Sequence, residues 1–142
     1  MHITHEPISV EAFLKEKPDA SCGASVHFIG TVRNHQDGRA VKRLYYECYE
    51  SMADKQIAAI MDRVTRTYGV DQIRVLHRVG WLEVGDVAII IKTSSAHRQE
   101  AFTACRTVVE EIKKKVPIWK KEVYGDGTSE WILCSHSAEV TS

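Results

Sequence analysis

The sequence has no excess of charge of either sign. Its 19 lysines and arginines balance 19 aspartates and glutamates, which gives a formal net charge of +0. Non-specific binding to nucleic acid requires a clear basic excess, so we expect no nucleic acid partner. Any site for an anion must come from a local cluster of cations.

Long hydrophobic runs are also missing. No stretch approaches the roughly 20 apolar residues that a membrane-spanning helix needs. Residues 1–17 lack the apolar core of a signal peptide. We therefore expect a cytoplasmic protein that does not bind membranes.

Metal-ligand pairs and cysteine pairs are missing as well. The histidines form no HxxxH or HExxH pair, and no CxxC pair occurs among Cys22, Cys48, Cys105 and Cys134. This spacing favours neither a zinc site nor a disulfide framework, so no metal is predicted. No lysine or histidine stands in an activating position beside a cysteine in the sequence. We therefore expect buried or half-buried thiols, and no cysteine nucleophile.

What the chain does have is the composition of a globular protein. Of its 142 residues, 44% are apolar and 27% are charged, which suits a folded domain with an ordinary core. It contains no repeat, low-complexity tract or linker. The sequence predicts a single domain over residues 1–142.

Three segments carry helical signals. Residues 51–68 have apolar residues at helical spacing, with Ser51 placed to cap the helix and Gly69 just past its end. Residues 98–115 repeat the pattern before a proline. A short helix is expected over residues 9–17.

Six segments are expected to be strands: 23–32, 41–49, 73–79, 86–93, 118–124 and 130–134. The first two are predicted to pair as a hairpin with a polar tip, and the last two as a closing hairpin. The segment between the third and fourth strands is expected to be a turn. The run VAIII indicates a buried central strand. Hairpins interrupted by two crossover helices predict an α+β fold with a mixed sheet.

Three lysines surround the segment VPIW: Lys113, Lys120 and Lys121. Lys113 extends an apolar line of its helix, so its amine reaches either water or a pocket. Strand alternation puts Lys120 on the face opposite Trp119. For both lysines, exposure to solvent is the simpler expectation. If they instead converge, they would neutralise a phosphate, and desolvation would lower a lysine pKa.

Two further basic groups could bind an anion. His97 and Arg98 open the second long helix, where free N–H groups and the helix dipole favour negative charge. The alternative is that Arg98 pairs with Glu100. Arg33 lies at the end of an apolar strand, where it could equally pair with a nearby acidic residue.

Five blocks in register resemble the successive motifs of one known family, the molybdopterin synthase catalytic subunit family, MoaE. They are FIGTVR (28–33), LYYECYESMA (44–53), HRVGWLEVGD (77–86), SSAHRQEAF (94–102) and KKKVPIWKKE (113–122). The resemblance runs over about residues 22–132. Any one block alone would be weak, whereas five in order are specific.

The resemblance implies an α/β hammerhead-type fold with an antiparallel hairpin subdomain. It implies a sulfurtransferase of molybdenum cofactor biosynthesis that acts as a homodimer within a heterotetramer. Its partner would be a small ubiquitin-like sulfur-carrier subunit with a thiocarboxylated Gly-Gly C-terminus. Its substrate would be cyclic pyranopterin monophosphate, which receives two sulfurs to form the molybdopterin dithiolene. No metal or redox cofactor is implied.

The resemblance also assigns residues. Lys113 and Lys120 match the catalytic lysines of the family. The substrate-binding positions comprise these two lysines and Thr31, Val32, Arg33, His97, Arg98, Lys121 and Glu122. One departure concerns an arginine that some relatives have soon after the closing tryptophan, because here residues 132–136 (ILCSH) follow Trp131.

A helix of this length separates two of these groups. Arg98 and Lys113 are 15 residues apart, which corresponds to ~22 Å along one helix. Both cannot easily grip one small pterin. We therefore expect a composite pocket, with Arg33, Lys113 and Lys120 from one chain and His97–Arg98 from its dimer mate.

Two alternatives stay open at this point. A non-enzymatic adaptor would dock a ubiquitin-like tail in a basic groove without changing a pterin. A cysteine-dependent acyl hydrolase would lose activity on Cys→Ser substitution.

Overall fold

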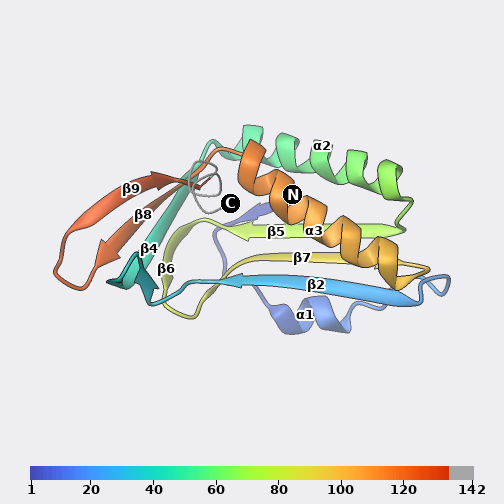
Figure 1. The fold of residues 1–142 in the computed structure, drawn as a ribbon, viewed down its shortest axis with the longest axis horizontal. Helices are drawn as coiled ribbons and strands as arrows, with labels where there is room; N and C mark the ends of the chain where they lie inside the picture. The colour runs from blue at the N-terminus through green and yellow to red at the C-terminus, as the bar shows by residue number, and fades with distance from the viewer. Residues whose placement is uncertain (135–142) are drawn as a thin grey trace.

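Two β-sheets and three helices make up residues 1–134, the part of the chain that the computed structural model describes (Figure 1). The first sheet has the order β1 (Ile3–Thr4), β5 (Gln72–Arg78), β7 (Val87–Ser95) and β2 (Ala24–Thr31). β1 runs parallel to β5, whereas the other pairs are antiparallel. The predicted mixed sheet with a buried central strand is therefore confirmed.

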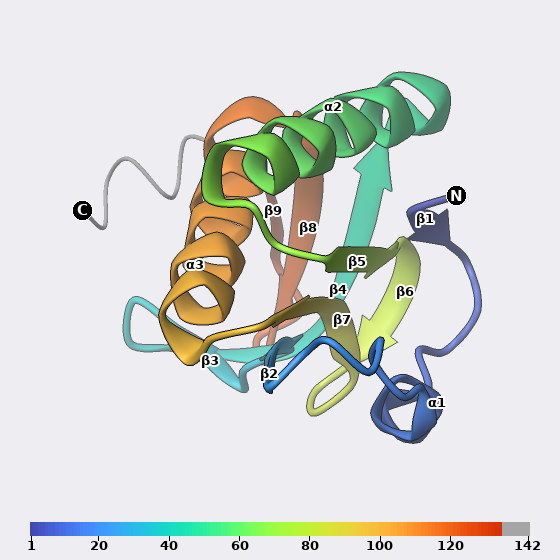
Figure 2. The ribbon, with the colours of Figure 1, turned by 90° about the vertical axis from the view of Figure 1, so that its right-hand side faces the viewer.

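The two long helices cover one face of the first sheet, and a short helix lies on the other face (Figure 2). The long helices are α2 (Glu50–Tyr68) and α3 (Arg98–Lys115), and the short one is α1 (Val10–Lys15). Their apolar positions face the core, as predicted: Ala53, Ile57, Ile60 and Val64 of α2, and Ala101, Cys105, Val108 and Ile112 of α3. Among residues 1–134, no helix is both long and apolar enough to cross a membrane.

The ends of α2 agree only partly with the prediction. Gly69 follows the helix in the left-handed conformation, with φ 66°, as its position indicated. Ser51 is not the cap, because the helix begins one residue earlier and Tyr49 takes the cap position without a side-chain hydrogen bond. β4 runs up to Cys48, so Tyr49 is the last extended residue before the helix.

The second sheet is antiparallel and forms the subdomain at one end of the molecule (Figure 1). It contains β3 (His35–Gln36), β4 (Arg39–Cys48), β8 (Ile118–Tyr124) and β9 (Ser129–Leu133). β8 and β9 form the closing hairpin that the sequence predicts. The fifth strand, β6 (Gly80–Glu83), pairs with β4 in the segment that was expected to be only a turn.

The predicted hairpin between residues 23–32 and 41–49 is wrong. β2 pairs with β7 along its whole length, and β4 pairs with β6 and β8. The tight turn lies within the expected polar tip, where Asp37 and Gly38 both have positive φ. Such a two-residue turn joins only the strands beside it, so β4 folds back on the two-residue β3 and enters the second sheet.

The part of the fold that concerns function is the junction of the two sheets. β2 ends there, β4 and β8 pass through it, and α3 points its C-terminal end at it. The predicted α+β fold with two main helices and an antiparallel subdomain is confirmed. The single domain over residues 1–142 stays a prediction, because it includes residues that the structure does not describe.

Candidate active site

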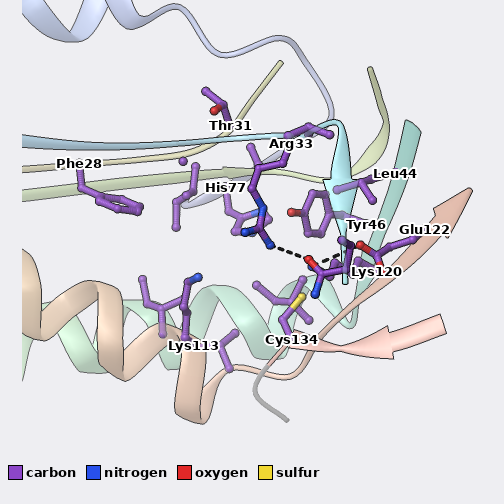
Figure 3. Close-up of a pocket in the computed structure, with 18 of the residues that line it drawn as sticks. Phe28, Thr31, Arg33, Leu44, Tyr46, His77, Lys113, Lys120, Glu122 and Cys134 are labelled. Atoms are coloured by element: carbon purple, nitrogen blue, oxygen red, sulfur yellow. Dashed lines mark hydrogen bonds and ion pairs between the residues drawn. The ribbon is translucent and has the colours of Figure 1, made fainter. Parts of the chain in front are cut away.

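A cavity of about 370 Å³ lies at this junction (Figure 3). Its walls come from the end of β2, the middle of β4, the last turn of α3 and the pocket-facing side of β8. A volume of this order suits a small molecule rather than a macromolecular surface. The cavity is therefore the candidate active site.

One row of residues across the first sheet makes part of the cavity lining. Gly30 of β2 lies opposite Ile89 of β7, which in turn lies opposite His77 of β5. A Cβ atom at Gly30 would come within 2.8 Å of the Ile89 Cγ2 atom. The missing side chain at Gly30 thus keeps this side of the cavity open.

Three of the predicted cations line this one cavity. Lys113 comes from the last turn of α3, Lys120 from β8, and Arg33 from the residues just after β2. Figure 3 shows the three side chains directed into the same space. The cavity therefore has a cluster of positive charge in a chain that is neutral overall.

Lys120 departs from the simpler expectation of solvent exposure. It does lie on the face opposite Trp119, but that face is the interior one, shared with Ile118 and Tyr124. The Lys120 side chain is only 17% exposed, whereas Trp119 is 44% exposed. Because the second sheet lies over the end of α3, the tryptophan faces outward and the lysine faces the cavity.

A buried carboxylate accompanies Lys120. Glu122 is 2% exposed, and its Oε2 atom lies 3.9 Å from the Lys120 Nζ atom. The Tyr124 hydroxyl lies 3.1 Å from Glu122 Oε1 and 3.0 Å from Glu130 Oε2. Burial and these two carboxylates raise the pKa of Tyr124. The pocket lysine thus has an anionic partner that is itself held in place.

Arg33 and the two residues before it form the part of the cavity wall at the end of β2. Arg33 donates a hydrogen bond of 2.5 Å to the Gln36 side-chain oxygen, which is a neutral acceptor. Its positive charge therefore remains available to a ligand. Thr31 and Val32 line the same cavity, as the resemblance implies.

Three predicted positions lie outside this cavity. His97 and Arg98 stand at the opposite end of α3 from Lys113. Lys121 points away from the cavity, on the Trp119 face of β8, with its amine 6.0 Å from the centre of the Trp131 ring. Within one chain the structure therefore unites Arg33, Lys113 and Lys120 but not the His97–Arg98 pair.

Two aromatic side chains outside the predicted site, Tyr46 and His77, also line the cavity. Tyr46 lies directly opposite Lys120 between β4 and β8. His77 packs edge-on against Tyr46, with ring centres 5.1 Å apart. Burial raises the pKa of Tyr46. Tyr46 could have been predicted, because it lies two residues after Leu44 in a strand and therefore on the same, inner face. No feature of the sequence indicated that His77 would line the cavity.

Cys134 lines the cavity as well, between the two lysines. Lys120 and Lys113 lower its pKa, but burial has the larger, opposite effect and raises it above the usual value. The raised pKa favours the protonated thiol at neutral pH. That no cysteine acts as a nucleophile stays a prediction. Cys134 belongs to the segment where some relatives have an arginine; Ser135 and His136 lie outside the described residues.

The buried His77 makes a specific contribution to acid sensitivity. Burial lowers the pKa of His77 from 6.5 to about 4. The positive charge of Lys113 adds to this lowering, whereas the backbone hydrogen bond to Arg78 opposes it. Between these values the unfolded chain binds a proton that the folded chain does not. Stability is therefore expected to fall by about 3 kcal/mol as pH decreases from 6.5 to 4. Urea unfolding at several pH values measures this loss, and His77→Gln should flatten it; an equally steep curve would contradict the assignment.

Comparison with known proteins identifies the family of the chain. The family model described as "MoaE protein" matches residues 3–115. A molybdopterin synthase catalytic subunit of Thermoplasma volcanium is 44% identical over 81% of this chain and 82% of its own length. The corresponding subunit of Bacillus subtilis is 40% identical over 92% of this chain and 82% of its own length.

Solved structures share the fold. The crystal structure of molybdopterin synthase from Staphylococcus aureus superposes with a TM-score of 0.86 at 37% identity, over 92% of this chain and 95% of that one. A complex of subunits 1 and 2 of molybdopterin-converting factor from Helicobacter pylori gives a TM-score of 0.73 at 20% identity, over 93% of this chain and 88% of that one. That likeness concerns the fold alone. By the family model and its close relatives, the chain belongs to the MoaE family of molybdopterin synthase catalytic subunits.

Proposed function

We propose that the cavity is the place where sulfur passes from a partner's thiocarboxylate to cyclic pyranopterin monophosphate. The observation that carries the proposal is the convergence of Arg33, Lys113 and Lys120 on one cavity of small-molecule size. Cations that face a confined space bind a phosphate more strongly than the same cations in water. The family membership of the chain supports the same reaction.

The chemistry assigns the nucleophile to the partner. The thiocarboxylate sulfur attacks a substrate carbon that carries an oxygen, and the bond between that carbon and the oxygen breaks. At one of the two carbons the departing oxygen belongs to the cyclic phosphate, which opens to a phosphate monoester; at the other carbon the oxygen leaves as water. One water molecule then hydrolyses the resulting thioester, which releases the tail as a carboxylate and leaves the sulfur on the pterin. Two such cycles give the dithiolene, and no thiol of this chain is consumed.

The two lysines have different roles in these reaction steps. Lys113, in the last turn of α3, stabilises the negative charge that develops on the oxygen of the attacked group. Lys120, beside the buried Glu122, donates a proton to the departing oxygen and accepts one from the water that hydrolyses the thioester. Arg33 binds the substrate phosphate through its guanidinium fork.

The partner is a small sulfur-carrier subunit whose C-terminal tail enters the cavity. The Helicobacter pylori structure contains two subunits of molybdopterin-converting factor in complex, which supports this kind of assembly. A cytoplasmic location, expected from the sequence, stays a prediction.

We also propose that the active unit is a homodimer. β2 is an edge strand of the first sheet among residues 1–134, and a second cavity of about 300 Å³ lies between it and the middle of α3. The apolar lining of this cavity includes Val26, Phe28 and Phe102, and Phe102 is 60% exposed. A second copy of the chain would cover this apolar surface.

The position of this groove explains how the pocket becomes complete. The groove lies midway between the Arg98 end and the Lys113 end of α3. A two-fold axis that passes through the groove perpendicular to α3 exchanges the two ends, because the two copies of the helix then run in opposite directions. The partner's His97 and Arg98 then approach the cavity that holds Lys113. They supply the anion-binding helix N-terminus that this cavity otherwise lacks.

The decisive experiment is a reconstitution. The chain is mixed with a thiocarboxylated small subunit and cyclic pyranopterin monophosphate, and mass spectrometry measures the products. Formation of the dithiolene product supports the proposal. Partner binding without any change in the pterin would support the adaptor alternative instead.

Cysteine substitution separates sulfur transfer from acyl hydrolysis. Cys134→Ser is the informative variant, because Cys134 lines the cavity whereas Cys22 and Cys48 do not. We expect Cys134→Ser to retain turnover in the reconstituted assay, since the attacking sulfur belongs to the partner. Complete loss of turnover in a folded variant would favour the cysteine-dependent mechanism.

A further inference from the structure

Two polar atoms of the cavity lining have no hydrogen-bond partner among the residues that the structure describes. Tyr46 and His77 both line it, among mainly apolar side chains such as Leu44, Ile89 and Val116. Among the hydrogen bonds of residues 1–134, none reaches the Tyr46 hydroxyl or the His77 Nε2 atom. Neither atom is among the fully buried polar atoms without a partner, so each has surface that solvent or a ligand can reach. Polar groups in protein interiors are nearly always hydrogen-bonded, so both atoms are open to a ligand in the cavity.

The structure defines what each atom offers. The His77 Nδ1 atom lies 2.8 Å from the Arg78 carbonyl oxygen. A carbonyl oxygen only accepts, so Nδ1 carries the hydrogen and Nε2 presents a lone pair. The Tyr46 hydroxyl presents a hydrogen that can be donated, and Figure 3 shows it directed into the cavity. The cavity therefore provides one acceptor and one donor side by side.

Both groups are held rigidly. His77 is 7% exposed and lies in β5, and Tyr46 lies in β4. Their rings meet edge to face, at an interplanar angle of 82°. The donor and the acceptor therefore keep their spacing when no ligand is bound, and little conformational entropy is lost on binding.

A donor beside an acceptor, between apolar walls, matches the edge of a planar lactam ring. The ring carbonyl would accept from Tyr46, and the adjacent ring N–H would donate to His77. We propose that Tyr46 and His77 recognise this edge of the pterin ring, while Arg33, Lys113 and Lys120 hold its phosphate. This inference rests on the proposed function, since it assumes a phosphorylated pterin as the ligand.

The test measures equilibrium binding without the partner subunit, by calorimetry. Two ligands are compared, cyclic pyranopterin monophosphate and inorganic phosphate, which has no ring. We expect Tyr46→Phe to raise the Kd of the pterin about tenfold, the usual effect of one lost hydrogen bond. The Kd of phosphate should stay unchanged. The matched control is Tyr45→Phe, because Tyr45 packs on Trp81 outside the cavity.

His77 is tested in the same way with two variants. His77→Leu removes the acceptor and should weaken pterin binding to a similar degree, whereas His77→Gln retains an acceptor and should restore part of the affinity. If a His77 variant does not fold, Tyr46→Phe alone decides. A pterin Kd in Tyr46→Phe equal to that of Tyr45→Phe would overturn the inference. The proposed function fails separately, through absence of product in the reconstituted wild-type reaction.

Discussion

Replacing Lys113 by alanine is expected to reduce turnover by about 10²–10³-fold, the usual effect of removing a preorganised charge from a reacting centre. Lys113 occupies the last turn of α3, and its side chain lines the cavity. Although Lys113 is exposed, its side chain borders the cavity, where its ammonium group stabilises the negative charge that develops on the substrate. Single-turnover formation of the dithiolene product, followed by mass spectrometry, measures the loss.

The neighbouring lysine supplies the control for this prediction. Lys114 is exposed, lies on the same turn of α3 and does not line the cavity. Lys114→Ala removes the same charge from the same helix end and should leave turnover near the wild-type value. Both variants should bind the small subunit as the wild type does. A wild-type rate in Lys113→Ala would refute its role.

The sequence predicted the positions of the two long helices well because both have apolar residues at helical spacing and a local stop signal. The bounds of α3 agree with the expected residues 98–115, since its apolar spacing is regular and Pro117 prevents continuation. The strand pairing was harder to predict. Whether β2 pairs with β4 or with β7 depends on contacts between segments far apart in the chain, which periodicity does not encode.

In the candidate site too, local features were predictable and contacts between distant segments were not. The resemblance picked out Lys113 and Lys120, whereas local patterns favoured solvent exposure for both. Lys113 is indeed exposed although it lines the cavity, and Lys120 is not. Only the placement of the second sheet over the end of α3 turns Lys120 inward. His77 was missed because its position in a strand of alternating burial predicts only that its side chain is buried, and not that it lines a cavity. Its importance comes from the Arg78 carbonyl and the cavity beside it.

Mixed dimers are expected to recover activity from two inactive parents. If the pocket is composite, a dimer of one Lys113→Ala chain and one Arg98→Ala chain has one site with both residues intact. Random mixing should then restore about a quarter of the wild-type sites, because half of the dimers are mixed and each has one complete site. Two affinity tags and tandem purification isolate the mixed dimer, in which half of the sites are complete.

The arrangement of the two substitutions distinguishes a composite pocket from a pocket within one chain. When Lys113→Ala and Arg98→Ala lie in the same chain, a dimer with a wild-type chain has no complete site if the pocket is shared, and one complete site if it is not. The composite pocket therefore predicts activity only when the substitutions lie in different chains. The opposite pattern would mean that Arg98 and Lys113 of the same chain serve the same pocket. Their ~22 Å separation along α3 makes this hard to achieve without unwinding the helix.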